Sequence, residues 1–161
     1  MNIGRISITS ILGLVLMTGA HAEGLCEADE AVIFNCELPR SVSSLCQSDG
    51  DGVLTYRNGG NGKINLKISD AGERIGKIFY FSNVPYAGGG EAHIRFSRSS
   101  YTYYLYDKTM KTNSGPAFSA GVVIYKDGKR ITNVACGNDA SIRERAYQKI
   151  TKEAYHSIGA Q

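Results

Sequence analysis

The chain has 161 residues, of which 42% are hydrophobic and 20% are charged, and it contains 19 Gly, 10 Tyr and no Trp. This length suits one ordinary domain and is too short for two. Collagen, low-complexity disorder and a coiled coil are excluded, because the apolar content is normal and no G-X-Y period occurs. The formal net charge is +3, a balance too weak to argue for a nucleic-acid-binding protein.

The N-terminal segment, residues 1–22, has the three parts of a secretory signal peptide. Arg5 supplies the positive charge, Ile6–Thr18 is a mostly apolar stretch, and Ala20-His21-Ala22 provides the small residues of an A-x-A cleavage site. The apolar stretch is shorter than the roughly 20 residues that a membrane-spanning helix needs. We therefore predict a cleaved signal peptide, an exported periplasmic protein without a membrane span, and a single β-rich domain over residues 23–161.

Four cysteines follow the predicted signal peptide: Cys26, Cys36, Cys46 and Cys136. In an oxidising compartment an even number of cysteines predicts disulfides, and no C-x-x-C or H-x-x-x-H spacing indicates zinc. Four cysteines allow three pairings, and the sequence leaves all three open. We favour Cys26–Cys46 with Cys36–Cys136, which would fix the N-terminal segment and tie the first strand to the last. Because Leu25 stands where a lipoprotein has a small residue, we expect no lipid anchor.

From Ala31 to about Ile131 the sequence alternates between short apolar runs and turn residues, which predicts strand after strand. The runs Asn58–Gly62 and Asp127-Gly128 tolerate positive φ and predict hairpins. We expect loops at Asn83–Gly90, which ends in three glycines, and at the polar segment Asp107–Pro116. The expected strands are Val32–Leu38, Ser43–Gln47, Val53–Arg57, Lys63–Ile68, Ile75–Ser82, Glu91–Ser97, Tyr101–Tyr106, Phe118–Lys126 and Lys129–Cys136.

The C-terminal part departs from this pattern. Apolar residues recur at helical spacing from Ile142 through Ala146 and Ile150 to Ala154, and the opposite face is charged. We predict one amphipathic helix over about residues 139–158, lying on the sheet or closing one end of a barrel. The predicted fold class is mainly β: an antiparallel meander of about eight or nine strands that forms a small sandwich or barrel, with one C-terminal amphipathic helix.

The groups that nucleophilic or acid–base catalysis requires are sparse after the signal peptide. The histidines that follow the predicted signal peptide are His93 and His156, and neither lies in a G-x-S-x-G or Cys–His context. His93 alternates with apolar neighbours, so we expect it on an exposed polar face. Glu91 follows Gly88-Gly89-Gly90, a run that lets a ligand approach the backbone but is commoner in hairpin connections. We therefore expect no catalytic residue, no metal and no cofactor, and we expect that the protein is not an enzyme.

Aromatic residues are densest in the strand Tyr101–Tyr106. Alternation puts Tyr104 and Tyr106 on one face and the odd-numbered residues, with Leu105, on the other. One face would build the core, and the other would display tyrosines beside a basic loop. Tyrosine anchors interfaces because a large rigid ring buries area at little entropic cost; the competing interpretation is packing between strands. The predicted binding residues are Tyr101, Tyr103, Tyr104, Tyr106, Lys108, Lys111 and Asn113.

A resemblance rests on Cys26, Phe34-x-Cys36, Ser44-Leu45-Cys46-x-Ser48 and Tyr56-Arg57-x-Gly59. With these residues the chain resembles uncharacterised small exported disulfide-bonded β-proteins of Gram-negative bacteria. The resemblance implies the fold and a periplasmic location, and it implies no activity. The architecture is also similar to that of periplasmic lysozyme inhibitors and type VI secretion immunity proteins, although none of the inhibitors' motifs matches residue by residue.

Three classes of function remain. The favoured one is a periplasmic protein-binding module, an inhibitor or immunity protein that blocks a cell-envelope-targeting enzyme or effector. The alternative is an envelope-accessory protein that binds glycan or lipid. A hydrolase with an unrecognised site, acting on cell-wall sugars or peptides, is the third. We expect no nucleic-acid partner.

Overall fold

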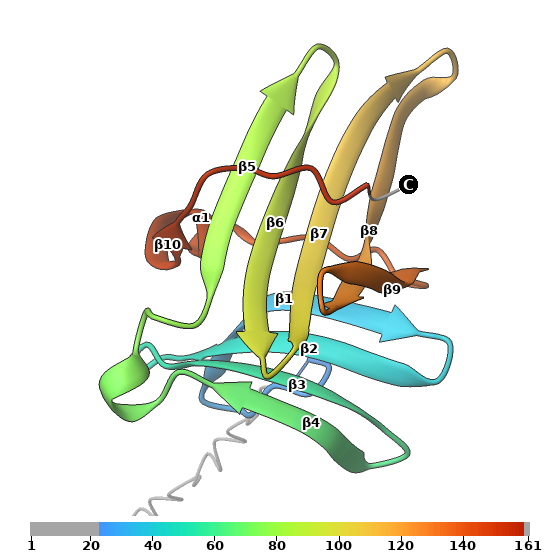
Figure 1. Cartoon of the computed structure of the whole chain (residues 1–161). Helices are drawn as coiled ribbons and strands as arrows, with labels where there is room; N and C mark the ends of the chain where they lie inside the picture. The colour runs from blue at the N-terminus through green and yellow to red at the C-terminus, as the bar shows by residue number, and fades with distance from the viewer. Residues whose placement is uncertain (1–22, 160–161) are drawn as a thin grey trace, which may run out of the picture.

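The computed structural model describes residues 23–159, which form ten β-strands, one 3-10 helix and one α-helix. The strands make two sheets that pack against each other, and the helix lies near the C-terminus (Figure 1). The predicted fold class, mainly β and sandwich-like with one C-terminal helix, is confirmed. The signal peptide predicted over residues 1–22 lies outside the described residues.

Sheet A is a four-stranded antiparallel meander formed by the N-terminal half of the described chain. Its last hairpin turns at Asn61-Gly62, where both residues have positive φ, as the Asn58–Gly62 run predicted. The strands are β1 (Glu30–Leu38), β2 (Ser41–Ser48), β3 (Leu54–Gly60) and β4 (Lys63–Ser69).

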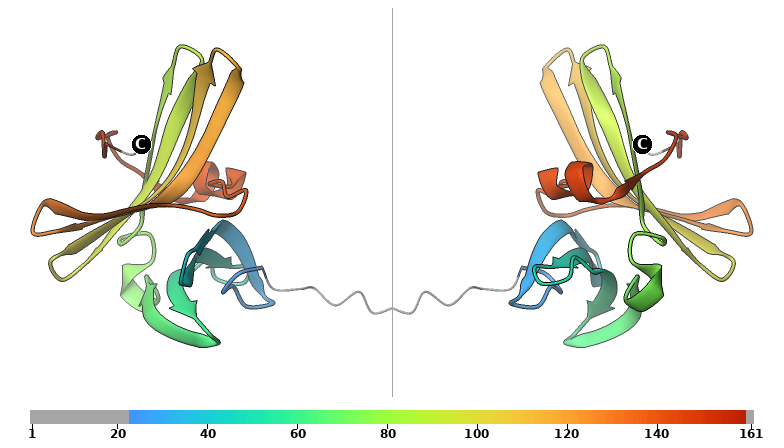
Figure 2. Two further views of the ribbon diagram at one scale, coloured as in Figure 1. Left: turned by 90° about the vertical axis from the view of Figure 1, so that its right-hand side faces the viewer. Right: turned by 90° about the vertical axis from the view of Figure 1, so that its left-hand side faces the viewer.

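Sheet B has six strands in the order β10-β5-β6-β7-β8-β9, and it follows the short 3-10 helix η1 (Gly72–Arg74). All its pairs are antiparallel except β10 with β5. Its long strands cross those of sheet A at a steep angle, so one end of sheet B extends beyond sheet A (Figures 1 and 2). The strands are β5 (Tyr80–Tyr86), β6 (Gly89–Arg98), β7 (Tyr101–Thr112), β8 (Gly115–Lys126), β9 (Lys129–Ala135) and β10 (Thr151–Lys152).

The core lies between the two sheets and is rich in aromatic rings. Sheet A contributes Phe34 and Tyr56, and sheet B contributes Phe96 and Tyr103. The ring centroid of Phe96 lies 4.6 Å from that of Tyr56 and 5.1 Å from that of Tyr103. Burial raises the pKa of Tyr56 to about 12, and its hydroxyl is hydrogen-bonded to Ser43 Oγ at 3.0 Å. Tyrosine and phenylalanine thus supply the large rings of a core that contains no tryptophan.

The outer face of sheet A, away from the core, is covered by the N-terminal segment, residues 23–29. The buried guanidinium of Arg57 binds Glu30 at 2.6 Å and Glu27 at 2.9 Å. A buried cation of this kind is tolerated because carboxylates replace the water that it loses on folding. The N-terminal segment is therefore part of the folded domain.

Both disulfides are present with the favoured pairing, Cys26–Cys46 and Cys36–Cys136, and no described cysteine is free. The first ties the N-terminal segment to β2. The second joins β1 of sheet A to the segment that follows β9 of sheet B. Two disulfides are consistent with an oxidising, exported compartment.

Two segments that we expected to be loops are the ends of long hairpins. The expected loop Asp107–Pro116 is mostly strand, because β7 and β8 stay paired up to a turn at Asn113-Ser114. The expected loop Asn83–Gly90 is wrong for the same reason, since β5 and β6 stay paired up to Ala87-Gly88. Polar residues suit a strand whose two faces both meet solvent, so these ends lack the alternation that reveals a half-buried strand. In contrast, the strand expected at Ile75–Ser82 is present only in its last three residues, which begin β5.

The helix expected over residues 139–158 is wrong in extent, because α1 covers only Glu144–Lys149. The predicted apolar stripe is correct for its first three members, Ile142, Ala146 and Ile150, which are buried in the core. Beyond them the chain becomes extended, and β10 pairs with the free edge of β5. Two consecutive β-branched residues follow the helix, and β-branched side chains favour the extended conformation. Hydrogen bonding to the edge of β5 therefore replaces the later turns of the expected helix.

Candidate functional site

The residues predicted to bind a partner are spread along the whole of β7. Tyr101 begins this strand and Asn113 follows its end. At about 3.3 Å per residue the two lie roughly 40 Å apart. One compact contact cannot include both, so the structure does not bring the predicted set together.

The residues predicted to bind a partner also differ in how far they are buried. Tyr103 belongs to the main core, and Tyr106 is fully buried in a second cluster with Val123 and Ile158. The even-numbered face of β7, which carries Tyr104 and Tyr106, is therefore largely covered. Among the predicted binding residues, Lys111 and Asn113 are exposed, Tyr101, Tyr104 and Lys108 are half-buried, and Tyr103 and Tyr106 are buried.

The cover is the C-terminal strap, residues 153–159, which crosses the outer face of sheet B from β5 towards β9 (Figure 1). At its start, Glu153 accepts two hydrogen bonds of 2.9 Å from Arg95 Nε. Towards its end, Tyr125 Oη donates to the carbonyl oxygen of Ile158 at 3.0 Å. Arg130 Nη1 donates to the carbonyl oxygen of Gly159 at 2.7 Å. These contacts fix an extended segment in a place where the sequence suggested a helix.

A polar pair lies beneath the strap. His93 is only 1% exposed, and its Nε2 lies 2.5 Å from Glu91 Oε1 in a hydrogen bond. Tyr155 of the strap stacks on the imidazole with 5.0 Å between ring centroids, and Lys108 Nζ lies 4.0 Å from Glu91 Oε2. The expectation that His93 is exposed is wrong. His93 does lie on the polar face of β6, as expected, but the strap covers that face.

The burial of His93 gives the fold a pH dependence. Desolvation lowers the pKa of His93 below its ordinary value of 6.5, so the unfolded chain takes up a proton at a higher pH than the folded chain. The free energy of unfolding should therefore fall as the pH drops below about 6.5, by up to about 1.4 kcal/mol per pH unit for one proton. Urea denaturation at about pH 7.5 and about pH 5.5 measures this fall. The variant His93→Gln, which does not titrate, should lose it; an unchanged fall in the variant would assign it to other groups.

The end of sheet B that extends beyond sheet A carries exposed apolar side chains. We call residues 84–90 and 109–118, the distal parts of the β5–β6 and β7–β8 hairpins, the projecting end. It includes Tyr86, Met110 and Phe118, which are 37%, 38% and 70% exposed. Sequence reasoning missed Phe118, because that residue alternates with Ala120 and Val122 and so has the pattern of a core residue. Phe118 projects from the same face of β8 as the core residues Ala120 and Val122, but sheet A does not extend to the projecting end.

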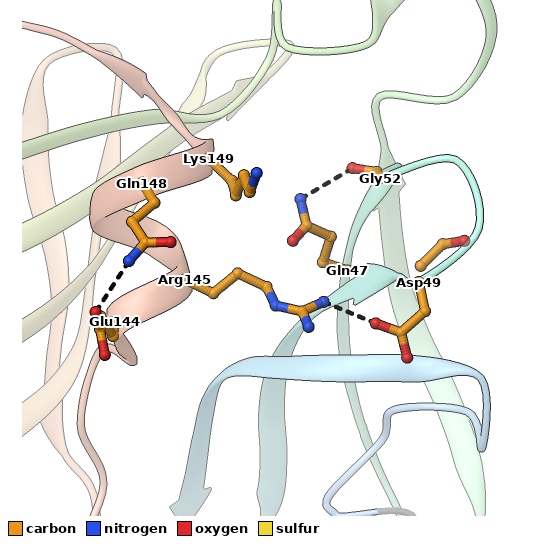
Figure 3. Close-up of a pocket in the computed structure, with 8 residues that line it drawn as sticks. Gln47, Asp49, Gly52, Glu144, Arg145, Gln148 and Lys149 are labelled. Atoms are coloured by element: carbon orange, nitrogen blue, oxygen red, sulfur yellow. Dashed lines mark hydrogen bonds and ion pairs between the residues drawn. The ribbon is translucent and has the colours of Figure 1, made fainter.

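An open groove lies between α1 and the turn that joins β2 to β3 (Figure 3). It has a volume of about 600 Å³. Arg145 on the helix binds Asp49 on the turn at 2.7 Å, and Gln148 donates to Glu144 at 2.9 Å. Gln47 donates to the carbonyl oxygen of a glycine in the same turn. Because these polar groups bind one another, the groove is best explained as a contact between helix and sheet.

One group of described residues has the spacing of metal ligands: Cys26, Glu30 and Cys46. The two sulfur atoms form a disulfide, and Glu30 already binds Arg57. Cysteine binds a metal as the thiolate, which a disulfide does not provide, so this group does not fit a metal ion.

No protein-family model, no curated protein and no solved structure matches the chain. Among the described residues, no helix has the length and apolar character needed to cross a bilayer.

Proposed function

We propose that the protein is an exported protein-binding module, an inhibitor or immunity protein that blocks a cell-envelope-targeting enzyme. The observation that supports this proposal is the set of exposed apolar side chains on the projecting end, led by Phe118. Tyr86 and Met110 project from the face that the strap crosses and Phe118 from the core side, so apolar groups lie on both faces of the projecting end. Aromatic residues and Met are enriched in interaction sites. A location in the periplasm belongs to the same proposal, and the two disulfides are compatible with it.

The shape of the projecting end suits the blocking of a cleft. Two long hairpins lie side by side, and the pairing of β6 with β7 ends at Gly90 and Thr109, at the base of this end. Hairpins held in register by their neighbours lose little conformational entropy on binding. The exposed Lys111 and Asn113 at one tip offer a cation and an amide. A cation there would raise the association rate with an acidic active site, such as that of a glycosidase.

The proposed contact differs from the tyrosine surface that the sequence suggested. It keeps Lys111 and Asn113 and adds Tyr86, Met110 and Phe118. The tyrosines of the first half of β7 become support for the sheet, because the core and the C-terminal strap cover most of them.

The test is binding and inhibition by variants of the projecting end. Immobilised protein should retain an envelope-active hydrolase from a periplasmic extract, and the purified protein should then inhibit that hydrolase. If Phe118 is a hot spot, Phe118→Ser should weaken binding by about 2 kcal/mol, or roughly thirtyfold in Kd. Because the side chain is 70% exposed, the free energy of unfolding should change by no more than about 0.5 kcal/mol.

The matched control is Ile131→Ser on β9. Ile131 is also an exposed large apolar residue, at 54%, but it lies outside the projecting end. Its replacement should leave binding and inhibition unchanged. Retention of a hydrolase without inhibition, or equal effects of the two substitutions, would overturn the proposal.

A further inference from the structure

A second cleft lies at the opposite end of sheet B from the projecting end. It is bounded by the end of β4, by η1 and by the turn between β6 and β7, and its volume is about 420 Å³. Ile68 and Ile78 supply apolar lining. The polar side chains that line it are those of Lys67, Arg74, Arg98, Ser69, Ser97 and Ser99.

The charged residues that line this cleft, among those whose side chains the structure describes, are all cationic. They are Lys67, Arg74 and Arg98. Ion pairs between described side chains engage Arg57, Arg95, Arg143 and Arg145 elsewhere in the fold, but none of the three cleft cations. These four arginines therefore have built-in counter-charges, whereas no ion pair between described side chains neutralises the cations of the cleft.

One of the cations is held at the cleft by the backbone. Arg98 Nη1 donates to the carbonyl oxygen of Lys67 at 3.5 Å, which draws the guanidinium towards β4. Burial raises the pKa of Glu30, but the hydrogen bonds and charge of Arg57 lower it more, and Lys67 adds a smaller charge effect in the same direction. Cations gathered without a counter-charge repel one another, and an anion placed among them removes that cost.

We propose that this cleft binds a phosphate group. Guanidinium and ammonium groups bind phosphate oxygens through charge-assisted hydrogen bonds, the guanidinium in a bidentate manner. The hydroxyls of Ser69, Ser97 and Ser99 supply further donors. A phosphate group is tetrahedral and has several charged oxygens, so it can contact three cations at once. A carboxylate ligand, with two oxygens in one plane, fits three cations less well. The ligand is a phosphomonoester, either a soluble sugar phosphate or the phosphorylated headgroup of an envelope lipid.

This inference goes beyond the proposed function and does not depend on it. The phosphate cleft and the projecting end lie at opposite ends of the long strands of sheet B. An inhibitor held at the envelope through a phosphorylated headgroup would keep its projecting end turned away from that contact. Each site is tested with variants that leave the other intact.

The test is titration of the full protein in phosphate-free buffer, monitored by calorimetry. The soluble probes are inorganic phosphate and glucose 1-phosphate, with glucose as the uncharged comparison. The vesicle probes are phosphatidylcholine alone and phosphatidylcholine with phosphatidic acid. We expect saturable binding to phosphate-bearing probes, weakened by added salt because exposed charges are screened. Binding of soluble phosphates assigns a soluble ligand, and binding restricted to phosphatidic acid vesicles assigns a lipid headgroup.

The variants are Arg98→Gln and Lys67→Gln, with Lys129→Gln on β9 as a matched control outside the cleft. Each cleft variant should raise Kd at least about tenfold, as expected for the loss of a charged hydrogen bond. Arg98→Lys should recover part of the affinity, and the control should stay within about twofold. All these side chains are exposed, so folding should be retained, and thermal melting checks it. Absence of saturable binding to every phosphate-bearing probe, or equal losses in the control, would refute the phosphate site.

Discussion

Replacing Tyr106 by Ala should lower the free energy of unfolding by about 3–5 kcal/mol, the range observed when a buried large aromatic residue is truncated. The side chain is fully buried with Val123 and Ile158. It also lies directly over Gly121, where a Cβ atom would come within 2.7 Å of the tyrosine ring. The ring thus fills space between the sheet and the C-terminal strap, and its removal leaves a cavity that the backbone of β8 cannot close.

Urea denaturation of Tyr106→Ala measures this loss, and Tyr104→Ala is the matched control. Tyr104 projects from the same face of β7 but is half-buried, so its truncation should cost clearly less. If Tyr106→Ala instead kept the stability of the parent protein and lost partner binding, the tyrosine face would be an exposed interface. The strap would then not cover this face in solution.

The strand content of the chain could be predicted because local rules govern it. Alternation of apolar and polar residues identified the half-buried strands of both sheets, from Val32–Leu38 to Phe118–Lys126. The turn Asp127-Gly128, where both residues have positive φ, was predicted from residue types alone. Local rules did not choose among the three disulfide pairings, although the favoured one, Cys26–Cys46 with Cys36–Cys136, is confirmed.

The covered face and the projecting end could not be predicted, because both depend on contacts between segments distant in sequence. His93 and Tyr106 lie on the polar face of their strands, and only the strap, residues 153–159, buries them. Phe118 has the pattern of a core residue and is exposed because sheet A ends before reaching it. Periodicity tells which side of a strand a residue occupies. It does not tell what covers that side.

The two disulfides should differ in their contribution to stability. Cys36 and Cys136 are 100 residues apart, whereas Cys26 and Cys46 are 20 apart. In the chain-entropy account, the longer loop stabilises the folded state by about 4.7 kcal/mol and the shorter loop by about 3 kcal/mol. Replacing Cys36 and Cys136 together by Ser should therefore destabilise the protein more than replacing Cys26 and Cys46 together. Both members of a pair are changed so that no free thiol remains.

Urea denaturation under non-reducing conditions compares the two double variants with the parent protein. The long-range disulfide joins β1 of sheet A to the segment after β9 of sheet B, so its loss removes a cross-link between the parts of the chain that form the two sheets. The short-range disulfide holds the N-terminal segment near the buried Arg57, whose ion pairs with Glu27 and Glu30 remain when the bond is absent. A larger loss for the short-range pair would therefore show that the N-terminal cover of sheet A depends on its disulfide more than on these ion pairs.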